Sequence, residues 1–108
     1  MGLDQYAYKV KGDQRWEIAY WRKHANLEGY MEEVFRSRGG IGDFNCVDLK
    51  LTKTDLLELR DKHRDLPDAD GFFWGETSQK KIEDTQTFIE VALQAVDEGW
   101  DIIYSSWW

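Results

Sequence analysis

Cysteine, proline and long apolar runs are scarce in this chain of 108 residues. Cys46 is the single cysteine, so no internal disulfide can form, which is typical of a protein from a reducing compartment. Pro67 is the single proline and 42% of the residues are apolar. This composition is that of a globular protein and not of a disordered chain. No apolar run reaches the length of a membrane span, and the first residues lack the charged-then-apolar pattern of a secretory signal. We therefore expect a cytoplasmic protein without a membrane partner, folded as a single domain over residues 1–108.

Basic residues are absent after Lys81, whereas six acidic residues follow that position. The whole chain carries a formal net charge of −7. Because contacts to phosphate need clustered Lys and Arg, we expect no nucleic-acid partner. The acidic C-terminal part has two interpretations that the sequence leaves open. It is either a solvated helix face, or a surface that binds a basic partner or mimics nucleic-acid phosphate.

Aromatic residues, in contrast, are abundant: they make up 15% of the chain, and six of them are tryptophans. Two tryptophans, Trp107 and Trp108, end the sequence. Exposed apolar rings favour association, so a free tail gains nothing from paired indoles. We expect the last residues to be held by the core, by a pocket or by a partner.

The N-terminal residues alternate in the manner of a β-strand, with Tyr6 and Tyr8 on the same face. After a turn, a second alternating segment places Trp16, Ile18 and Tyr20 together on one face. The short connection predicts that the two strands pair antiparallel.

Three further segments favour extended structure. They are residues 47–51, the aromatic run 72–75 as either a strand or a buried loop, and residues 100–108. The last segment carries apolar groups on both faces, which indicates a strand inside the sheet or beneath a helix.

Three helices are indicated by their N-terminal caps. Asn26 is the expected N-cap of the first helix, and Thr52 with Asp55 forms a capping box at the start of the second. Thr77 or Ser78 caps the third and longest helix. The prediction is an α+β domain in which three helices pack on one mostly antiparallel sheet of four to five strands.

Aromatic and basic side chains gather at the junction between the second strand and the first helix, residues 19–26. A helix N-terminus offers free N–H groups and positive potential, so an anion fits there, and the neighbouring rings can stack on a ligand. The alternative is a strand end whose charges face water and whose rings enter the core. Two other aromatic clusters, 72–74 and 107–108, also lie at element ends, where pockets form. The candidate residues for binding a ligand or partner are Tyr20, Trp21, Arg22, Lys23, His24, Asn26, Phe73, Trp74 and Trp107.

The sequence indicates no metal site and no cofactor. His24, His63 and Cys46 are the good transition-metal ligands, and they do not have the spacing of two to five residues that a structural site uses. We expect His63 at the edge of the core and Cys46 as a small core residue.

Four motifs, in this order along the sequence, make the chain similar to a known protein family. They are MGLDQY at 1–6, YWRKHANL at 20–27, GFFWG at 71–75 and YSSWW at 104–108. The chain resembles a family of small phage and bacterial proteins, with cyanophages among their sources. The family has no established molecular function, so the resemblance implies no catalytic residue. Some members are labelled phosphoglycerate kinase, an enzyme of two domains and several times this length, and one short domain cannot supply its two opposed sites.

These observations favour a phage-encoded binding or regulatory protein that acts in the host cytosol through an aromatic and basic surface. Its partner would be a host protein or a small anionic ligand, and an edge strand ending in Trp107 and Trp108 would also suit a homodimer. The alternative is a small enzyme for an anionic metabolite or nucleotide, with His24 as acid–base and Arg22 and Lys23 holding the anion. A third interpretation puts all the rings in the core and the function on the acidic helix face.

Overall fold

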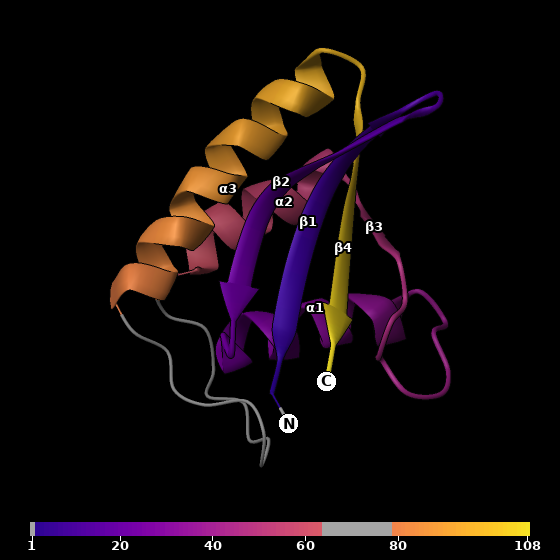
Figure 1. The fold of residues 1–108 in the computed structure, drawn as a ribbon, viewed down its shortest axis with the longest axis vertical. Helices are drawn as coiled ribbons and strands as arrows, with labels where there is room; N and C mark the ends of the chain where they lie inside the picture. Colours follow the sequence, from indigo (N-terminus) through magenta and orange to yellow (C-terminus); the bar gives the residue numbers. More distant parts are fainter. Residues whose placement is uncertain (1, 64–78) are drawn as a thin grey trace.

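The computed structural model describes residues 2–63 and 79–108, which form a four-stranded antiparallel sheet with three helices packed on it (Figure 1). The α+β prediction is therefore confirmed. The expected strand or loop at 72–75, the caps Thr77 and Ser78, and the candidates Phe73 and Trp74 lie outside the described residues. The elements are β1 (Asp4–Lys11), β2 (Gln14–Arg22), α1 (Ala25–Ser37), β3 (Leu49–Leu51), α2 (Lys53–Lys62), α3 (Gln79–Asp97) and β4 (Asp101–Trp107).

The strand order is β2-β1-β4-β3, and every neighbouring pair is antiparallel. β4 thus lies inside the sheet, as its two apolar faces predict. β4 is therefore not the edge strand that would suit a homodimer, because it pairs with β1 on one side and with β3 on the other. The homodimer itself stays a prediction. Asp4 pairs with Trp107, so the two ends of the chain lie side by side (Figure 1).

A β-bulge interrupts the β1–β2 pairing and corrects the predicted alternation of β2. Ala7 pairs with Ala19 but Tyr8 pairs with Glu17, so Ile18 is the extra residue. An extra residue reverses the faces on its two sides. Trp16 and Tyr20 therefore point to opposite faces, and the prediction that they share a face is wrong.

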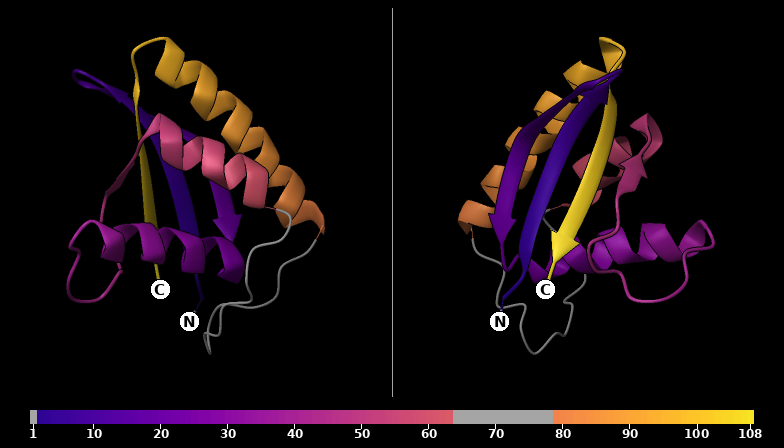
Figure 2. Two further views of the ribbon diagram at one scale, coloured as in Figure 1. Left: turned by 180° about the vertical axis from the view of Figure 1, so that it is seen from behind. Right: turned by 45° about the vertical axis from the view of Figure 1, so that its right-hand side comes forward.

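The core lies between the sheet and the helices, all of which cover the same face of the sheet (Figure 2). The covered face carries Ala7, Trp21 and Tyr104, which are at most 2% exposed. The Trp21 ring packs edge-on against Phe88 of α3, with ring centroids 5.1 Å apart, and its indole N–H donates to Thr85 Oγ1 at 3.0 Å. One face of the sheet is thereby buried, and no helix of the described residues lies on the other.

The helix starts are fixed by local hydrogen bonds. The capping box of α2 is confirmed: Thr52 Oγ1 accepts from the Asp55 N–H at 3.2 Å, and the Asp55 carboxylate accepts from the Thr52 N–H at 2.8 Å. The prediction for α1 is wrong, because its N-cap is His24 and not Asn26. The chain turns at Lys23, whose φ is +61°, and this turn brings His24 Nδ1 to the Leu27 N–H at 3.4 Å.

Across the part of the chain that the structure describes, no helix is both long enough and apolar enough to span a bilayer.

Candidate functional site

The sheet face opposite the helices, here called the open face, carries a group of aromatic side chains. Tyr6, Tyr20 and Trp107 alternate with the buried residues of their strands, so they point away from the helices. Tyr8 lies on the same face, two residues after Tyr6 in β1. We call Tyr6, Tyr8, Tyr20 and Trp107 the aromatic platform.

The three tyrosine rings of the platform are close together, and all four platform residues are partly exposed to solvent. The Tyr6 and Tyr8 rings are stacked with centroids 6.3 Å apart, and the Tyr6 and Tyr20 centroids are 5.2 Å apart. Tyr20 is 46% exposed and Trp107 is 62% exposed. Large aromatic side chains left in water on a rigid sheet are typical of an interaction surface.

Ion pairs cover the end of the open face near the β1–β2 turn. The Arg15 guanidinium lies 4.2 Å from the Tyr8 ring centroid and reaches both carboxylate oxygens of Asp48, at 3.2 and 3.3 Å. Lys50 pairs with Asp101 at 3.5 Å. The cations at this end of the face are therefore already engaged.

The other end of the open face, next to the chain ends, carries an acidic residue, Asp4, beside a basic residue, Arg22, on the neighbouring strand. Arg22, Asp4 and Trp107 are in register across β2, β1 and β4. The Tyr20 hydroxyl donates to Asp4 Oδ1 at 2.7 Å, and this bond raises the pKa of Tyr20. Within the described ranges, Arg22 makes no ion pair.

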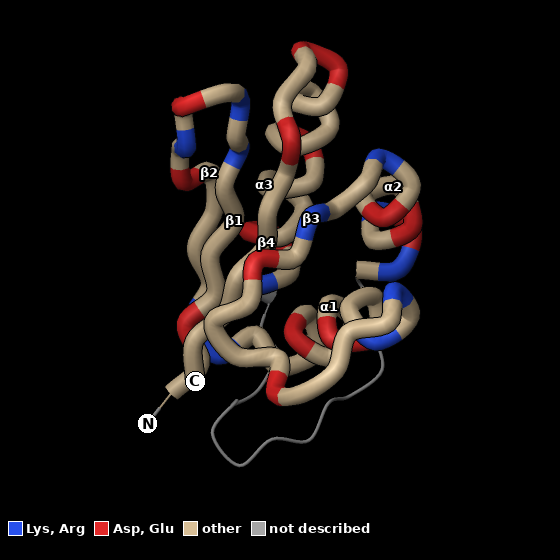
Figure 3. The backbone as a smooth tube through the Cα atoms, turned by 90° about the vertical axis from the view of Figure 1, so that its right-hand side faces the viewer, with Lys and Arg blue, Asp and Glu red and all other residues tan. Residues whose placement is uncertain are grey.

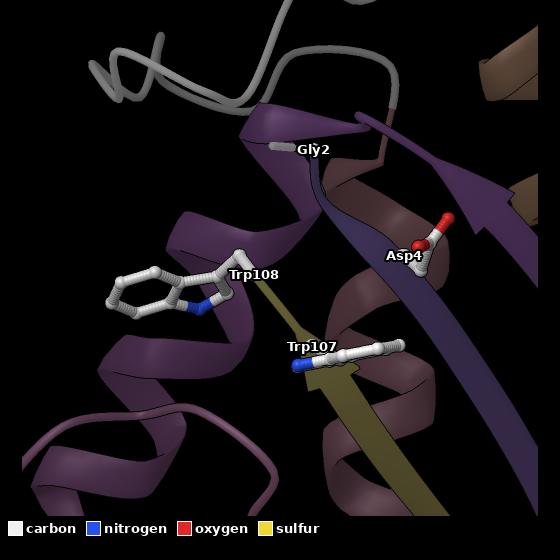
Figure 4. Close-up of a pocket in the computed structure, with 4 residues that line it drawn as sticks. All are labelled: Gly2, Asp4, Trp107 and Trp108. Carbon is white, nitrogen blue, oxygen red and sulfur yellow. The ribbon is translucent and has the colours of Figure 1, made fainter.

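A cavity of about 280 Å³, here called the terminal pocket, lies at this end of the sheet and is lined by Gly2, Asp4, Trp107 and Trp108 (Figure 4). Asp4 and Trp107 project from the neighbouring strands β1 and β4, whereas Trp108 turns toward α1. The Trp108 indole N–H donates to the Phe44 carbonyl at 2.9 Å and to Glu28 Oε2 at 3.1 Å. One wall of the pocket is therefore fixed by the core, and the other is an exposed indole.

Glu28 of α1 is a buried carboxylate beneath this end of the sheet. Besides Trp108, it accepts from the Tyr104 hydroxyl at 2.6 Å and from Ser106 Oγ at 2.8 Å. Gln5 Nε2 donates in turn to the Tyr104 oxygen at 2.9 Å. Burial raises the pKa of Glu28 to about 7, although its three donors oppose that rise. This network holds the end of β4 against α1.

Three of the predicted candidate residues, Tyr20, Arg22 and Trp107, meet on the open face. Trp21 points the other way into the core, because neighbouring residues of a strand face opposite sides. Lys23 lies at the turn after β2, where its N–H donates to the Leu3 carbonyl at 2.7 Å.

The remaining candidates of that segment, His24 and Asn26, lie at the start of α1. His24 is fully buried, and Asn26 is half-buried in the first turn of the helix. Burial, with a contribution from Lys81, lowers the pKa of His24 to about 4, so its imidazole is neutral at pH 7. A buried, neutral capping side chain offers a substrate in solution no exposed nitrogen.

Asp4, Tyr6 and Tyr8 were missed by the sequence reasoning as members of the site. The alternation of β1 already put the two tyrosines on one face, but it did not say which face the helices would cover. Glu28 had no signal of this kind, because an acid inside a helix usually faces water.

Within the part of the chain that is described, no group of three His, Cys, Asp or Glu side chains is placed to hold a metal ion. His63 is 7% exposed, at the edge of the core as expected. Cys46 is exposed, so its predicted place in the core is wrong. The φ of Cys46 is +59°, which places the residue in a turn, and its backbone N–H donates to the Ser106 carbonyl at 2.7 Å. In this turn the thiol is left in solvent.

No protein-family model, no curated protein and no solved structure matches this chain.

Proposed function

We propose that this chain is a binding protein that takes up a partner protein on the aromatic platform. The observation that carries the proposal is the position of Tyr20 and Trp107, large aromatic side chains 46% and 62% exposed on the sheet face opposite the described helices (Figure 2). Tyr and Trp provide much contact area for little conformational entropy, which is why they dominate the energetic centres of protein interfaces.

A single-stranded nucleic acid is the other ligand class that stacks on aromatic sheets, and the charges argue against it. Such ligands need a positive groove along the phosphate backbone. Here basic and acidic positions are interspersed along the sheet (Figure 3), and the cations Arg15 and Lys50 are paired with Asp48 and Asp101. The net charge of −7 opposes polyanions and small anionic ligands alike.

The proposal is tested with a display library of random peptides selected against the whole protein. Peptides that bind should lose most of their affinity for the variants Trp107→Ala and Tyr20→Ala. Trp16→Ala is the matched control, because Trp16 is 58% exposed but points to the other face of the sheet beyond the bulge. The proposal is wrong if the selected peptides bind the Trp107 and Tyr20 variants as well as they bind the parent chain.

A further inference from the structure

We infer that the terminal pocket receives an arginine side chain from a basic segment of the partner. This inference rests on the proposed function, because the pocket opens at one end of the aromatic platform. It adds the chemistry of the ligand, which the platform by itself does not specify.

The lining of the pocket suits a cation. An indole face attracts a guanidinium or ammonium group through the negative potential of its ring, and Trp is the strongest of the aromatic residues in this respect. Trp107 is 62% exposed and lines the pocket beside a carboxylate from the next strand, Asp4. Within the described residues, that carboxylate accepts one side-chain hydrogen bond, from the Tyr20 hydroxyl at 2.7 Å. A carboxylate has about four acceptor positions, so Asp4 can also accept from a guanidinium.

The position of the pocket suits one side chain better than a free metabolite. Its volume is about 280 Å³, near the lower end of the range for ligand sites. Sites for drug-sized ligands enclose most of the ligand surface. A pocket with four lining residues at the edge of an exposed sheet is better suited to one group that projects from a larger partner.

The charge of the whole molecule points to the same ligand. A net charge of −7, with no Lys or Arg after Lys81, favours encounter with a positively charged partner. Arginine matches the pocket better than lysine, because its planar group both stacks on an indole and pairs with a carboxylate through two N–H groups.

Substitution of Arg22 tests the inference, because the affinity should change in opposite directions for a cationic and an anionic ligand. Arg22 lies in register with Asp4 on the side away from Trp107, where its positive charge opposes a second cation. Arg22→Gln should therefore tighten the binding of a cationic ligand by roughly 2- to 5-fold. For an anionic ligand the same substitution should weaken binding.

The experiment is an NMR titration of the whole protein that follows the assigned indole N–H signal of Trp107. The probes are two short glycine peptides of the same sequence, one with arginine and one with citrulline, which has nearly the same shape but no charge. The Trp107 signal should move with the arginine peptide and stay with the citrulline peptide. Trp107→Ala should weaken the arginine peptide roughly 5- to 30-fold, and Asp4→Asn roughly 3- to 10-fold. Trp16→Ala and Glu83→Gln, an exposed acid on α3, are the matched controls and should leave the affinity unchanged.

Equal binding of the two peptides, or weaker arginine binding in Arg22→Gln, would overturn the inference. The proposed function would survive that result if library peptides still depended on Trp107 and Tyr20. If tetramethylammonium or guanidinium ions compete at the concentration at which the arginine peptide binds, the site serves a free small cation and the partner segment is overturned. If no library peptide depends on the platform, both proposals fail together.

Discussion

At the scale of single residues, two buried ionisable groups give the fold opposite pH dependences. Burial raises the pKa of Glu28 from 4.5 to about 7, so its contribution to stability is full below pH 4.5 and is lost as the pH rises through 7. Burial lowers the pKa of His24 from 6.5 to about 4, so its contribution is full above pH 6.5 and is lost as the pH falls through 4. Lys81 and His63 further lower the pKa of His24, and Asp84 opposes them. Between pH 4.5 and 6.5 the two contributions have slopes of opposite sign, and they largely cancel.

Glu28→Gln should reveal this compensation, because it removes one of the two slopes and keeps the shape of the side chain. The free energy of unfolding of the variant, minus that of the parent chain, should rise by about 1.4 kcal/mol per pH unit between pH 4.5 and 7, and level off above. Urea unfolding at half-unit steps of pH measures this difference. Glu33→Gln, which changes an exposed acid on the same helix, is the control. A difference for Glu28→Gln that does not vary with pH would contradict the assignment.

At the scale of elements, α2 is the helix whose start is best explained by its own residues. Its capping box closes within four residues, and the Arg38 guanidinium at the end of α1 pairs with the same Asp55 carboxylate. Tyr30 of α1 adds a bond from its hydroxyl to the Asp55 carbonyl at 3.0 Å. A local signal in the sequence thus also joins two helices.

Thr52→Ala should destabilise the protein by about 1 kcal/mol, because the Asp55 N–H then loses its partner at the helix start. Thr54→Ala is the matched control: Thr54 is exposed one residue inside the helix, and the change to alanine should be neutral or slightly stabilising. Thermal or urea unfolding of both variants gives the comparison. Equal effects of the two substitutions would show that the capping box contributes nothing.

At the scale of the whole molecule, the two terminal tryptophans belong to different parts of the fold. Trp108 joins the end of the chain to α1 and to the segment before β3, through Glu28 and the Phe44 carbonyl. Its backbone N–H donates to Asn45 Oδ1 at 3.0 Å. Trp107 points to the open face and is 62% exposed. The last residues were expected to be held by the core, by a pocket or by a partner: the core holds Trp108, whereas Trp107 lines the terminal pocket.

Trp108→Ala should lower the free energy of unfolding by roughly 1–3 kcal/mol, because it leaves the Phe44 carbonyl and one side of Glu28 with fewer donors. Trp107→Ala should change it by only about 0.5 kcal/mol or less, as expected for an exposed side chain. Chemical unfolding of both variants, followed by circular dichroism, measures the difference. The opposite order would mean that Trp107 stabilises the fold, and its use as a binding variant would then have to be abandoned.

Predictions made from the sequence succeeded where the partners are close along the chain. The Thr52–Asp55 box and the place of β4 in the sheet followed from local spacing and from the apolar groups on both faces of the last segment. The predicted N-cap of α1 was wrong because the chain turns at Lys23, which has a positive φ, and the helix therefore starts after His24. The predicted sheet face of Trp16 was wrong because the alternation of residues in the sequence gives no sign of the bulge at Ile18. Glu28 and Tyr104 are 76 residues apart in the sequence, and no pattern in the sequence indicated the hydrogen bond between them.

The sequence by itself determined the type and order of the described elements and the acidic balance, because these depend on neighbouring residues and on composition. Only the tertiary structure decided which aromatic rings are core and which are surface. Tyr20 and Trp21, like Trp107 and Trp108, are adjacent in the chain and point in different directions, and the helices cover one face of the sheet. The packing of α1 and α3 on that face buries Trp21 and holds Trp108, and it leaves Tyr20 and Trp107 in solvent.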